Sequence, residues 1–213
     1  MQRPFFRNVM TLAIVAVASL VMTATSAHAS LVINSVTVSG FSAENGGFNR
    51  LARYTVDGSG LSGNAHNNTA SGGMWMQGVR PGGDKDGPAF IIYDLGGVFE
   101  VDSFNVWNYN EFLSNRGFKD VVVTFGQTAA LGSTLASVTQ FAQAPGTNGY
   151  LGQLFSFSPI TARFIRFEGL NNYGGDEIGL AEVRFFALIP EPATASLGLL
   201  SACGLMLRRR RMA

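Results

Sequence analysis

The stretch AFIIYDLGGVFEVDSFNVW, residues 89–107, decides the fold of this chain. Its first run, Ala89–Leu95, is almost wholly apolar and ends at Gly96-Gly97, which is typical of a buried strand followed by a turn. Its second run, Val98–Trp107, places apolar residues along a further strand with a break near Ser103. The stretch therefore predicts two consecutive strands of a β-domain.

Similar short runs lie on both sides of this stretch. They are Leu31–Val38, Leu51–Val56, Phe118–Phe125, Thr134–Phe141, Leu154–Phe157, Arg163–Phe167 and Leu180–Phe186. Turns rich in Gly, Pro and Asn separate them, and no stretch between residues 30 and 189 holds a helical period for three turns. Because the chain shows no internal repeat, a propeller is disfavoured. The pattern predicts an all-β jelly-roll β-sandwich over residues 30–189.

The composition excludes several classes of protein. Of the 213 residues, 46% are hydrophobic and 14% are charged, which is too apolar a composition for a disordered chain. One Cys excludes a disulfide framework, and two His exclude a multi-His metal centre. Residues 30–189 hold nine Lys and Arg against 13 Asp and Glu, a net charge of −4. This balance argues against nucleic acid as a partner.

The N-terminus is typical of a secretory signal peptide. Arg3 and Arg7 precede a largely apolar stretch, and Ala27-His28-Ala29 forms a small-residue cleavage pattern. We expect residues 1–29 to be removed and the mature chain to start at Ser30. The alternative is a retained membrane anchor.

The C-terminus has three parts in a fixed order. Pro190-Glu191-Pro192 is followed by the apolar stretch Ala193–Leu207 and then by Arg208, Arg209, Arg210 and Arg211. This order resembles a PEP-CTERM sorting signal, here residues 190–213. The resemblance implies a short membrane span with its basic end in the cytoplasm, and cleavage by an exosortase in a Gram-negative bacterium. Such proteins are associated with exopolysaccharide and biofilm material. A plain tail anchor is the alternative.

Between the termini, several segments arrive in a recognisable order. They are Val56-Asp57-Gly58, Met74-Trp75, Tyr93-Asp94-Leu95-Gly96, Ala162-Arg163-Phe164-Ile165-Arg166-Phe167 and Gly179-Leu180-Ala181-Glu182-Val183. This set resembles the discoidin, or coagulation factor V/VIII type C, family with its galactose-binding-like jelly roll. The match spans about residues 50–186, with a longer interval than usual between Asp57-Gly58 and Trp75. The resemblance implies binding of carbohydrates, lipid headgroups or proteins by loops at one end of the sandwich.

The same resemblance implies a structural calcium ion. Asp57 and Glu182 would supply side-chain oxygens, and backbone carbonyls near Ser59 and Ala181 would supply others. Calcium takes 6–8 hard oxygen ligands, so this donor set is chemically suitable. The alternative is an ordinary Asp-Gly turn beside a strand glutamate.

Two loops carry side chains suited to sugar recognition, which needs an aromatic face together with amide or charged groups. The candidate ligand-binding residues are Tyr109, Asn110, Glu111 and Arg116 in one loop and Asn172 and Tyr173 in the other. The alternative is that the Asn residues only shape turns. We expect Trp75 and Trp107 to lie in the core, and Arg163 and Arg166 to pair with acids such as Asp94.

Enzymatic signals are weak. Gly58–Gly63 matches G-x-G-x-x-G, but a loop rather than a helix follows it, so a dinucleotide site is disfavoured. His66 is expected on a surface loop, and no G-x-S-x-G elbow is present. The acids near loops, Glu111, Asp120, Asp176 and Glu177, form no diagnostic pair for glycoside hydrolysis.

We therefore expect an exported, exosortase-processed, non-catalytic binding module. Its predicted ligand is a carbohydrate at the cell surface or in the extracellular matrix, and its contact with the inner membrane is transient. The alternative hypothesis is a structural or adhesive matrix protein that binds another protein and has no affinity for sugars.

Overall fold

The computed structural model describes residues 30–78, 88–135 and 138–189, so the predicted signal peptide and sorting signal lie outside the described residues. The strands are β1 (Ser30–Val32), β2 (Thr37–Phe41), β3 (Leu61–Ser62), β4 (Ala65–His66), β5 (Trp75–Met76), β6 (Ala89–Asn108), β7 (Asp120–Gly126), β8 (Ser133–Thr134), β9 (Thr139–Gln140), β10 (Gln153–Gly169) and β11 (Gly179–Leu188). Three short 3-10 helices are η1 (Gly46–Phe48), η2 (Ala52–Thr55) and η3 (Ser114–Arg116). Within these described ranges, no helix has the length and apolar character that crossing a membrane requires.

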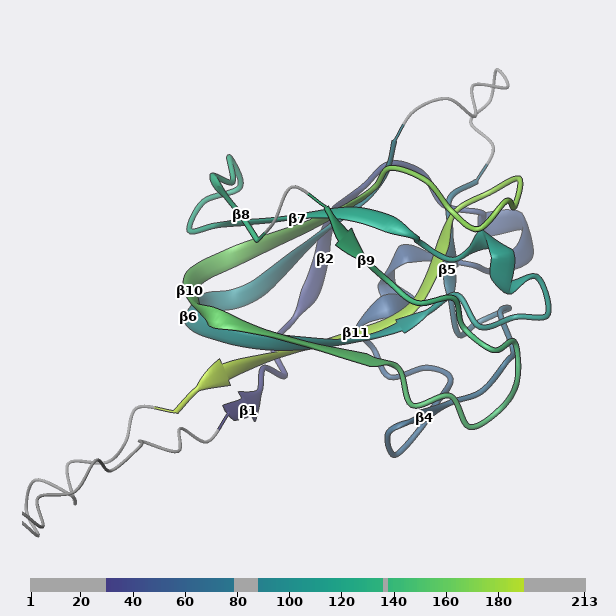
Figure 1. The fold of residues 1–213 in the computed structure, drawn as a ribbon, viewed down its shortest axis with the longest axis horizontal. Coiled ribbons are helices and arrows are strands. Elements are labelled where there is room, and N and C mark those ends of the chain that lie inside the picture. Colours follow the sequence, from purple (N-terminus) through teal and green to yellow (C-terminus); the bar gives the residue numbers. More distant parts are fainter. Residues whose placement is uncertain (1–29, 79–87, 136–137, 190–213) are drawn as a thin grey trace, which may run out of the picture.

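Two long antiparallel strands, β6 and β10, form the frame of the sheet (Figure 1). The first part of β6 lies between β2 and β10, which in turn pairs with β7. The second part of β6 lies between β10 and β11, and β1 lies outside β11. The sheet thus curls over so that its two halves enclose one core. The predicted all-β jelly-roll architecture is confirmed.

The expected division at Gly96-Gly97 is wrong, because β6 runs through it as one strand of 20 residues. Gly96 has a φ of +79°, and a Cβ atom there would lie 2.9 Å from the Ser35 side chain. Glycine lets the strand bend at this point, where its pairing with β10 shifts register between Asp94–Phe164 and Phe99–Ala162. The two runs Leu154–Phe157 and Arg163–Phe167 likewise join into β10, with register shifts between them.

Three other expected strands differ from the structure. The Leu51–Val56 segment forms η2, where the Ala52 amide donates to Glu44 and the Tyr54 hydroxyl donates to Asn49. These local bonds satisfy the backbone without a strand partner. Leu31–Val38 is interrupted between β1 and β2, and Thr134–Phe141 is interrupted between β8 and β9.

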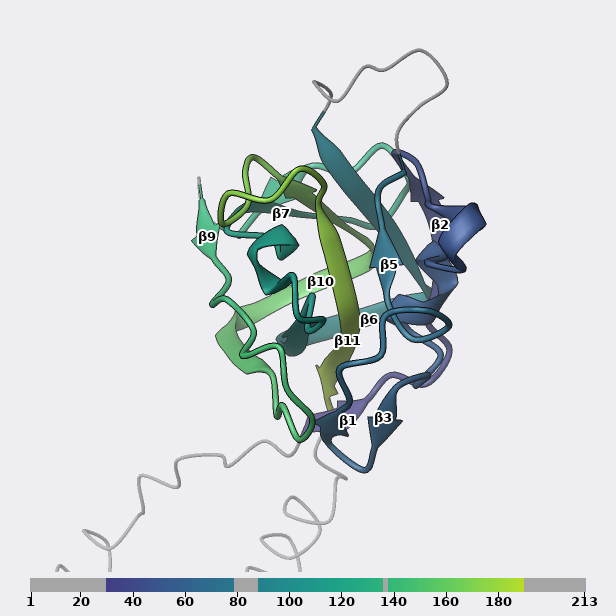
Figure 2. The same ribbon diagram turned by 90° about the vertical axis from the view of Figure 1, so that its right-hand side faces the viewer.

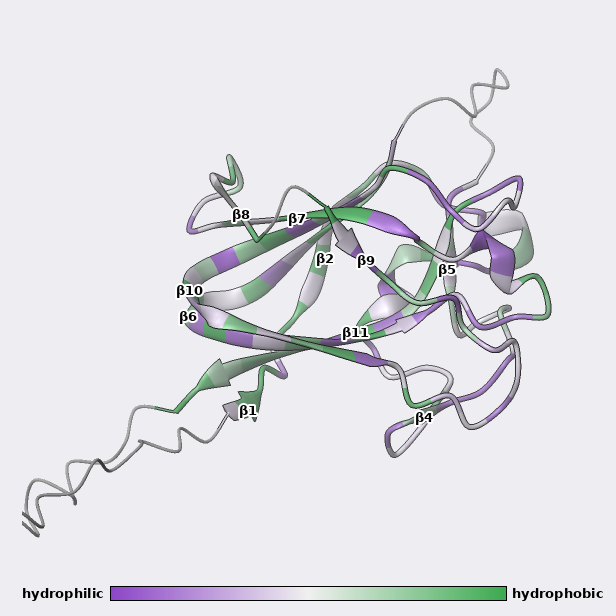
Figure 3. Cartoon of the chain, in the orientation of Figure 1, coloured by the Kyte–Doolittle hydropathy of each residue, from purple (hydrophilic) through white to green (hydrophobic). Residues whose placement is uncertain are grey.

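Aromatic side chains fill the core. The Phe104 ring lies at the centre, with centroid distances of 5.0–6.3 Å to five other phenylalanine rings. These neighbours are Phe141, Phe155, Phe157, Phe167 and Phe185. Tilted and edge-on pairs of this kind each add about 0.5–1.5 kcal/mol beyond burial. Burial alternates along β7, where every second side chain points into this core, and Figure 3 shows the hydrophobic residues that β7 and β10 carry.

A second, smaller core lies beneath the chain segment that carries β3, β4 and β5. It contains Ala70, Met74, Met76, Trp107, Tyr109 and Ala181. The Trp107 indole nitrogen donates to the Asn64 carbonyl at 3.1 Å, and that of Trp75, in the main core, donates to the Ala43 carbonyl at 2.9 Å. The expectation that both tryptophans are buried is confirmed.

The ends of residues 30–189 lie together. Ser30 pairs with Leu188, so β1 and β11 close the sheet where the described chain begins and ends. Figures 1 and 2 show this pair at one end of the molecule and the irregular loops around β4, β5 and η3 toward the other. The paired terminal strands and the core thus lie within residues 30–189, the span that the sequence predicted as one domain.

Candidate functional site

The loop end of the sandwich is built by segments far apart in the sequence. The Phe118–Asn172 and Gly117–Gly179 bridges join the loop after β6 to the loop before β11. The Tyr173 amide also donates to the Asn115 carbonyl at 3.0 Å. These bonds hold the two loops that the sequence singled out side by side.

An ion pair lies at this end. The Arg50 guanidinium donates to Glu111 at 2.9 Å, and the Tyr109 hydroxyl donates to the other oxygen of the same carboxylate at 2.8 Å. Only 13% of the Arg50 side chain and 14% of the Glu111 side chain are exposed. The Arg50 guanidinium also lies 5.8 Å from the centres of the Phe48 and Tyr109 rings.

Two exposed phenylalanines belong to the segments that supply this ion pair. Phe48 is 67% exposed at the end of η1, and Phe112, directly after Glu111, is 77% exposed. We call the set Phe48, Arg50, Glu111 and Phe112 the loop platform. It offers two apolar faces beside a fixed donor and a fixed acceptor, an arrangement able to hold a planar or ring-shaped polar ligand.

A second ion pair lies next to the loop platform. Arg116 binds Glu177 at 3.2 Å. Arg50 and Arg116 both contact the Met76 sulfur, at 3.2 and 3.6 Å, so the two ion pairs are neighbours. The predicted residues Glu111 and Arg116 are therefore brought together, each already paired with a charge that the sequence did not reveal.

Tyr109 and Asn110 are not on the surface, contrary to the expectation. Both side chains are fully buried. The Asn110 amide donates to the carbonyls of Asn67 at 2.9 Å and Thr147 at 2.7 Å, and its oxygen accepts from Gly146 at 2.9 Å. Asn110 thus joins three chain segments. Burial, followed by the bond to Glu111, raises the pKa of Tyr109. Neither side chain can contact a ligand directly.

The second predicted loop is also shaped by its own side chains. The Asn172 amide donates to two carbonyls, and its oxygen accepts from the amides of Gly174 and Gly175. Asn172 is therefore a loop organiser, as the alternative held. Tyr173 donates to the Phe141 carbonyl while Lys119 lies 5.8 Å from its ring centre, which leaves the ring partly exposed beside the second ion pair.

Phe48, Arg50 and Phe112 were missed by the sequence reasoning. Phe112 follows two polar residues in a loop, and Phe48 follows two glycines, so neither belongs to an alternating strand pattern. A phenylalanine outside any strand period has no core position assigned to it. Their position outside any strand pattern could have indicated that both rings are exposed.

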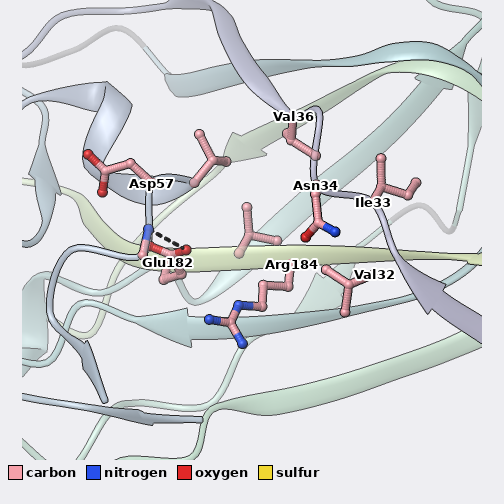
Figure 4. A pocket seen from close by; sticks show the side chains of 10 residues that line it. Val32, Ile33, Asn34, Val36, Asp57, Glu182 and Arg184 are labelled. Carbon is pink, nitrogen blue, oxygen red and sulfur yellow. Dashed lines mark hydrogen bonds between the residues drawn. The ribbon is translucent and has the colours of Figure 1, made fainter. Parts of the chain in front are cut away.

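A separate pocket of about 480 Å³ lies beside β11 (Figure 4). It is lined by Val32, Ile33, Asn34, Val36, Val56, Asp57, Gly58, Glu182, Val183 and Arg184. Glu182 is buried; one of its oxygens accepts from the Gly58 amide at 3.1 Å, and the other has no partner. Asp57 accepts from the Ser59 amide at 2.8 Å and from the Ser59 hydroxyl.

Two carboxylates, Asp57 and Glu182, line this pocket together with the Arg184 guanidinium. Burial, reinforced by the negative charge of Asp57, raises the pKa of Glu182 to about 8. A buried carboxylate oxygen without a partner beside a second carboxylate suits a hard, oxygen-binding ion. In the part of the chain that the structure describes, no three His, Cys, Asp or Glu side chains gather as a metal site. A cation here would therefore take its other ligands from carbonyls such as those near Ser59 and Ala181, or from water.

His66 is buried rather than on a surface loop, which corrects the expectation. Its ring contacts Gly60, whose φ is +85°, and a Cβ atom at Gly60 would lie 2.6 Å from the ring. The G-x-G-x-x-G segment continues into the short β3–β4 hairpin, not into a helix. Gly60 of this segment therefore makes room for the His66 ring. No helix begins after the segment, so the helix N-terminus that binds the phosphates of a dinucleotide is missing here.

Other acids and arginines are engaged in pairs. Arg163 binds Asp94 through two bonds of 2.8 and 2.9 Å, as expected, and lowers the pKa of that carboxyl. Arg166 pairs with Glu168 at 2.6 Å. Asp120 accepts from Asn171 and Gln140.

Comparison with known proteins shows the fold. No protein-family model matches the sequence, and no curated protein matches it. Several solved structures are similar to this chain in fold. The family 32 carbohydrate-binding module (CBM) of C. perfringens NanJ in complex with galactose is 17% identical, with a TM-score of 0.53 over 74% of this chain and 99% of that one.

Two further modules from Clostridium perfringens are similar. CBM32-3 from a family 31 glycoside hydrolase is 15% identical, with a TM-score of 0.57 over 74% of this chain and 94% of its own. CpGH89CBM32-5, in complex with GalNAc-β-1,3-galactose, is 17% identical, with a TM-score of 0.51 over 75% of this chain and all of its own. At these identities the likeness shows a shared CBM32-type jelly roll.

Proposed function

We propose that residues 30–189 form a non-catalytic carbohydrate-binding module that acts at the cell surface or in the exopolysaccharide matrix. The fold supports this proposal, because two of the similar CBM32 modules were solved with galactose or a galactose-containing disaccharide. The chain would reach this location through its signal peptide and through exosortase cleavage near Pro190-Glu191-Pro192.

The loop platform is the observation that carries the proposal. A sugar ring has an apolar C–H face that packs on an aromatic ring, and Phe48 and Phe112 are the two most exposed large hydrophobic side chains among the described residues. Arg50 and Glu111, fixed by their mutual bond and by Tyr109, would donate to and accept from hydroxyl groups. Arg116, Glu177 and Tyr173 would extend the contact along a longer glycan.

We also propose that the Asp57–Glu182 pocket holds a structural calcium ion. The ion would supply the positive charge that the unpartnered Glu182 oxygen lacks and would tie the Asp57–Ser59 turn to β11. Its contribution would be to the stability of the domain, since the loop platform is built by other residues.

The binding proposal is tested with purified residues 30–189 on a polysaccharide panel that includes the host exopolysaccharide, with calcium and with chelator. Phe48→Ala and Phe112→Ala should each weaken binding to the recognised glycan about tenfold or more, because each removes a stacking face. Val98→Ala is the control, since Val98 is 55% exposed in the middle of β6, away from the loop that follows this strand.

Two outcomes would contradict this proposal. One is the absence of binding to any glycan in the panel, which would favour the protein-binding alternative. The other is binding that persists unchanged in both phenylalanine variants, which would place the sugar elsewhere.

The sorting proposal is tested in cells with the full chain. Substitution of Glu191 by Ala should leave a longer, membrane-associated product, whereas the parent chain is cleaved and leaves the membrane. Equal cleavage of both chains would argue for a plain tail anchor or an unrelated protease.

A further inference from the structure

One half of the sandwich has an outer surface that mixes apolar and charged side chains. Direct register pairs place Ile92, Arg166 and Thr124 in one row across β6, β10 and β7. The next row holds Phe90, Glu168 and Val122, and the row on the other side holds Asp94, Phe164 and Gly126. We call these nine residues the outer face.

The outer face differs from the inner face of the same strands in burial. Ile91, Tyr93, Ile165, Phe167 and Val123, which alternate with it, are all fully buried in the core. Phe90, Ile92, Phe164 and Val122 are instead only half-buried, although they are apolar. A sheet face exposed to solvent normally carries polar residues at these positions. Figure 3 shows the apolar and polar bands alternating along β10.

The outer face carries three charged side chains. Asp94, on β6, is already bound by Arg163, and the other two lie on the middle strand. Arg166 pairs with Glu168 at 2.6 Å, and its guanidinium lies 4.4 Å from the centre of the Phe90 ring. Both charged side chains are about 30% exposed. The Arg166 Nε–H group is buried and has no acceptor.

We propose that the outer face binds the outer face of a second copy of this chain. Arg166 and Glu168 lie on either side of Phe167 along β10. A two-fold axis that crosses β10 at Phe167, perpendicular to the strand, brings Arg166 of each copy opposite Glu168 of the other. The surface is thus complementary to itself in charge, as an isologous contact requires. Each Arg166 then faces the Glu168 carboxylate of the other copy in addition to its own.

The size of the outer face sets the strength of this contact. Strands are spaced about 4.8 Å apart and rise about 3.3 Å per residue, so the face covers roughly 300–400 Å² in projection. A standard stable interface buries about 800 Å² per partner. We therefore infer weak pairing in solution, which gains avidity where many copies lie in one matrix. This inference does not depend on sugar binding.

The test is a charge exchange on residues 30–189, measured by sedimentation equilibrium up to about 1 mM in chelator. The parent domain should dimerise reversibly. Arg166→Glu makes both charges on the middle strand negative, and Glu168→Arg makes both positive, so each variant alone should lose self-association about tenfold or more. An equimolar mixture of the two variants should associate again, and so should the double variant Arg166→Glu/Glu168→Arg.

Far-UV circular dichroism checks that each variant is folded, and Ile92→Lys supplies a second probe of the same face if either charge variant is not. A parent domain that stays monomeric up to about 1 mM overturns the proposal. So does dimerisation that is unchanged in the single variants, or a mixture that fails to associate. Binding of an acidic polysaccharide at Arg166 by a monomeric domain would identify a glycan, not a second copy, as the occupant.

Discussion

Glu182→Gln is the substitution that tests the pocket beside β11 most directly. The carboxylate is buried, one oxygen has no partner, and the nearby charge of Asp57 opposes its ionisation. The amide keeps the acceptor for the Gly58 amide and is neutral without taking up a proton, as Glu182 must do when the domain folds at neutral pH. In calcium-free buffer at neutral pH, the variant should therefore be more stable than the parent domain.

The size of the effect follows from the pKa of Glu182, which is raised from 4.5 to about 8. A group whose pKa is raised by folding contributes its full stability below the unfolded value, and that stability is lost as pH rises toward the folded value. At about 1.4 kcal/mol per pH unit, the calcium-free parent loses about 3 kcal/mol between pH 4.5 and pH 7. For a domain of this size, that is a difference of about 6–12 °C in Tm.

Thermal unfolding of parent and Glu182→Gln domains between pH 4.5 and 8.5 measures this difference, with chelator and with calcium. In chelator, the two Tm values should be similar at pH 4.5 and diverge in favour of the variant up to pH 8. With calcium, the parent should gain stability and the variant should not. Glu100→Gln, at an exposed site on β6, is the control and should match the parent throughout. A variant less stable than the parent at pH 7 in chelator would refute the reasoning.

The structure makes three further predictions. Asn110→Ala should lower the free energy of unfolding in urea by about 3 kcal/mol, because three hydrogen bonds between loops are lost. A decrease of less than about 1 kcal/mol would show that the loops keep their structure without this amide. Gly60→Ala should lower stability by about 2 kcal/mol or more through the positive φ and the clash with His66, and the control Gly63→Ala, with an open surrounding at φ +63°, should lower it less. Phe112→Ala should change stability by less than about 0.5 kcal/mol while it weakens glycan binding; a large loss of stability would mean that the ring packs in the fold.

The candidate site could be predicted from the sequence only in part. Glu111 and Arg116 were expected near a ligand, and they do lie together at the loop end. Tyr109 and Asn110 were expected there too, but the structure buries both. The reason is that their neighbours come from distant segments: Asn110 bonds to Asn67 and Thr147, which are 43 and 37 residues away. No local pattern reports such contacts.

The sequence by itself determined the elements whose cause is local. Alternation over a few residues fixes which side of a strand is buried, so the runs that form β7 and β11 and the buried tryptophans were predictable. The tertiary structure alone decided how these elements continue and meet. It joined the runs on both sides of Gly96-Gly97 into one strand, because β10 pairs with both runs, with a register shift between Ala162 and Phe164 opposite the two glycines. It also brought Gly58 to Glu182, 124 residues away, since only the closed sheet places these groups side by side.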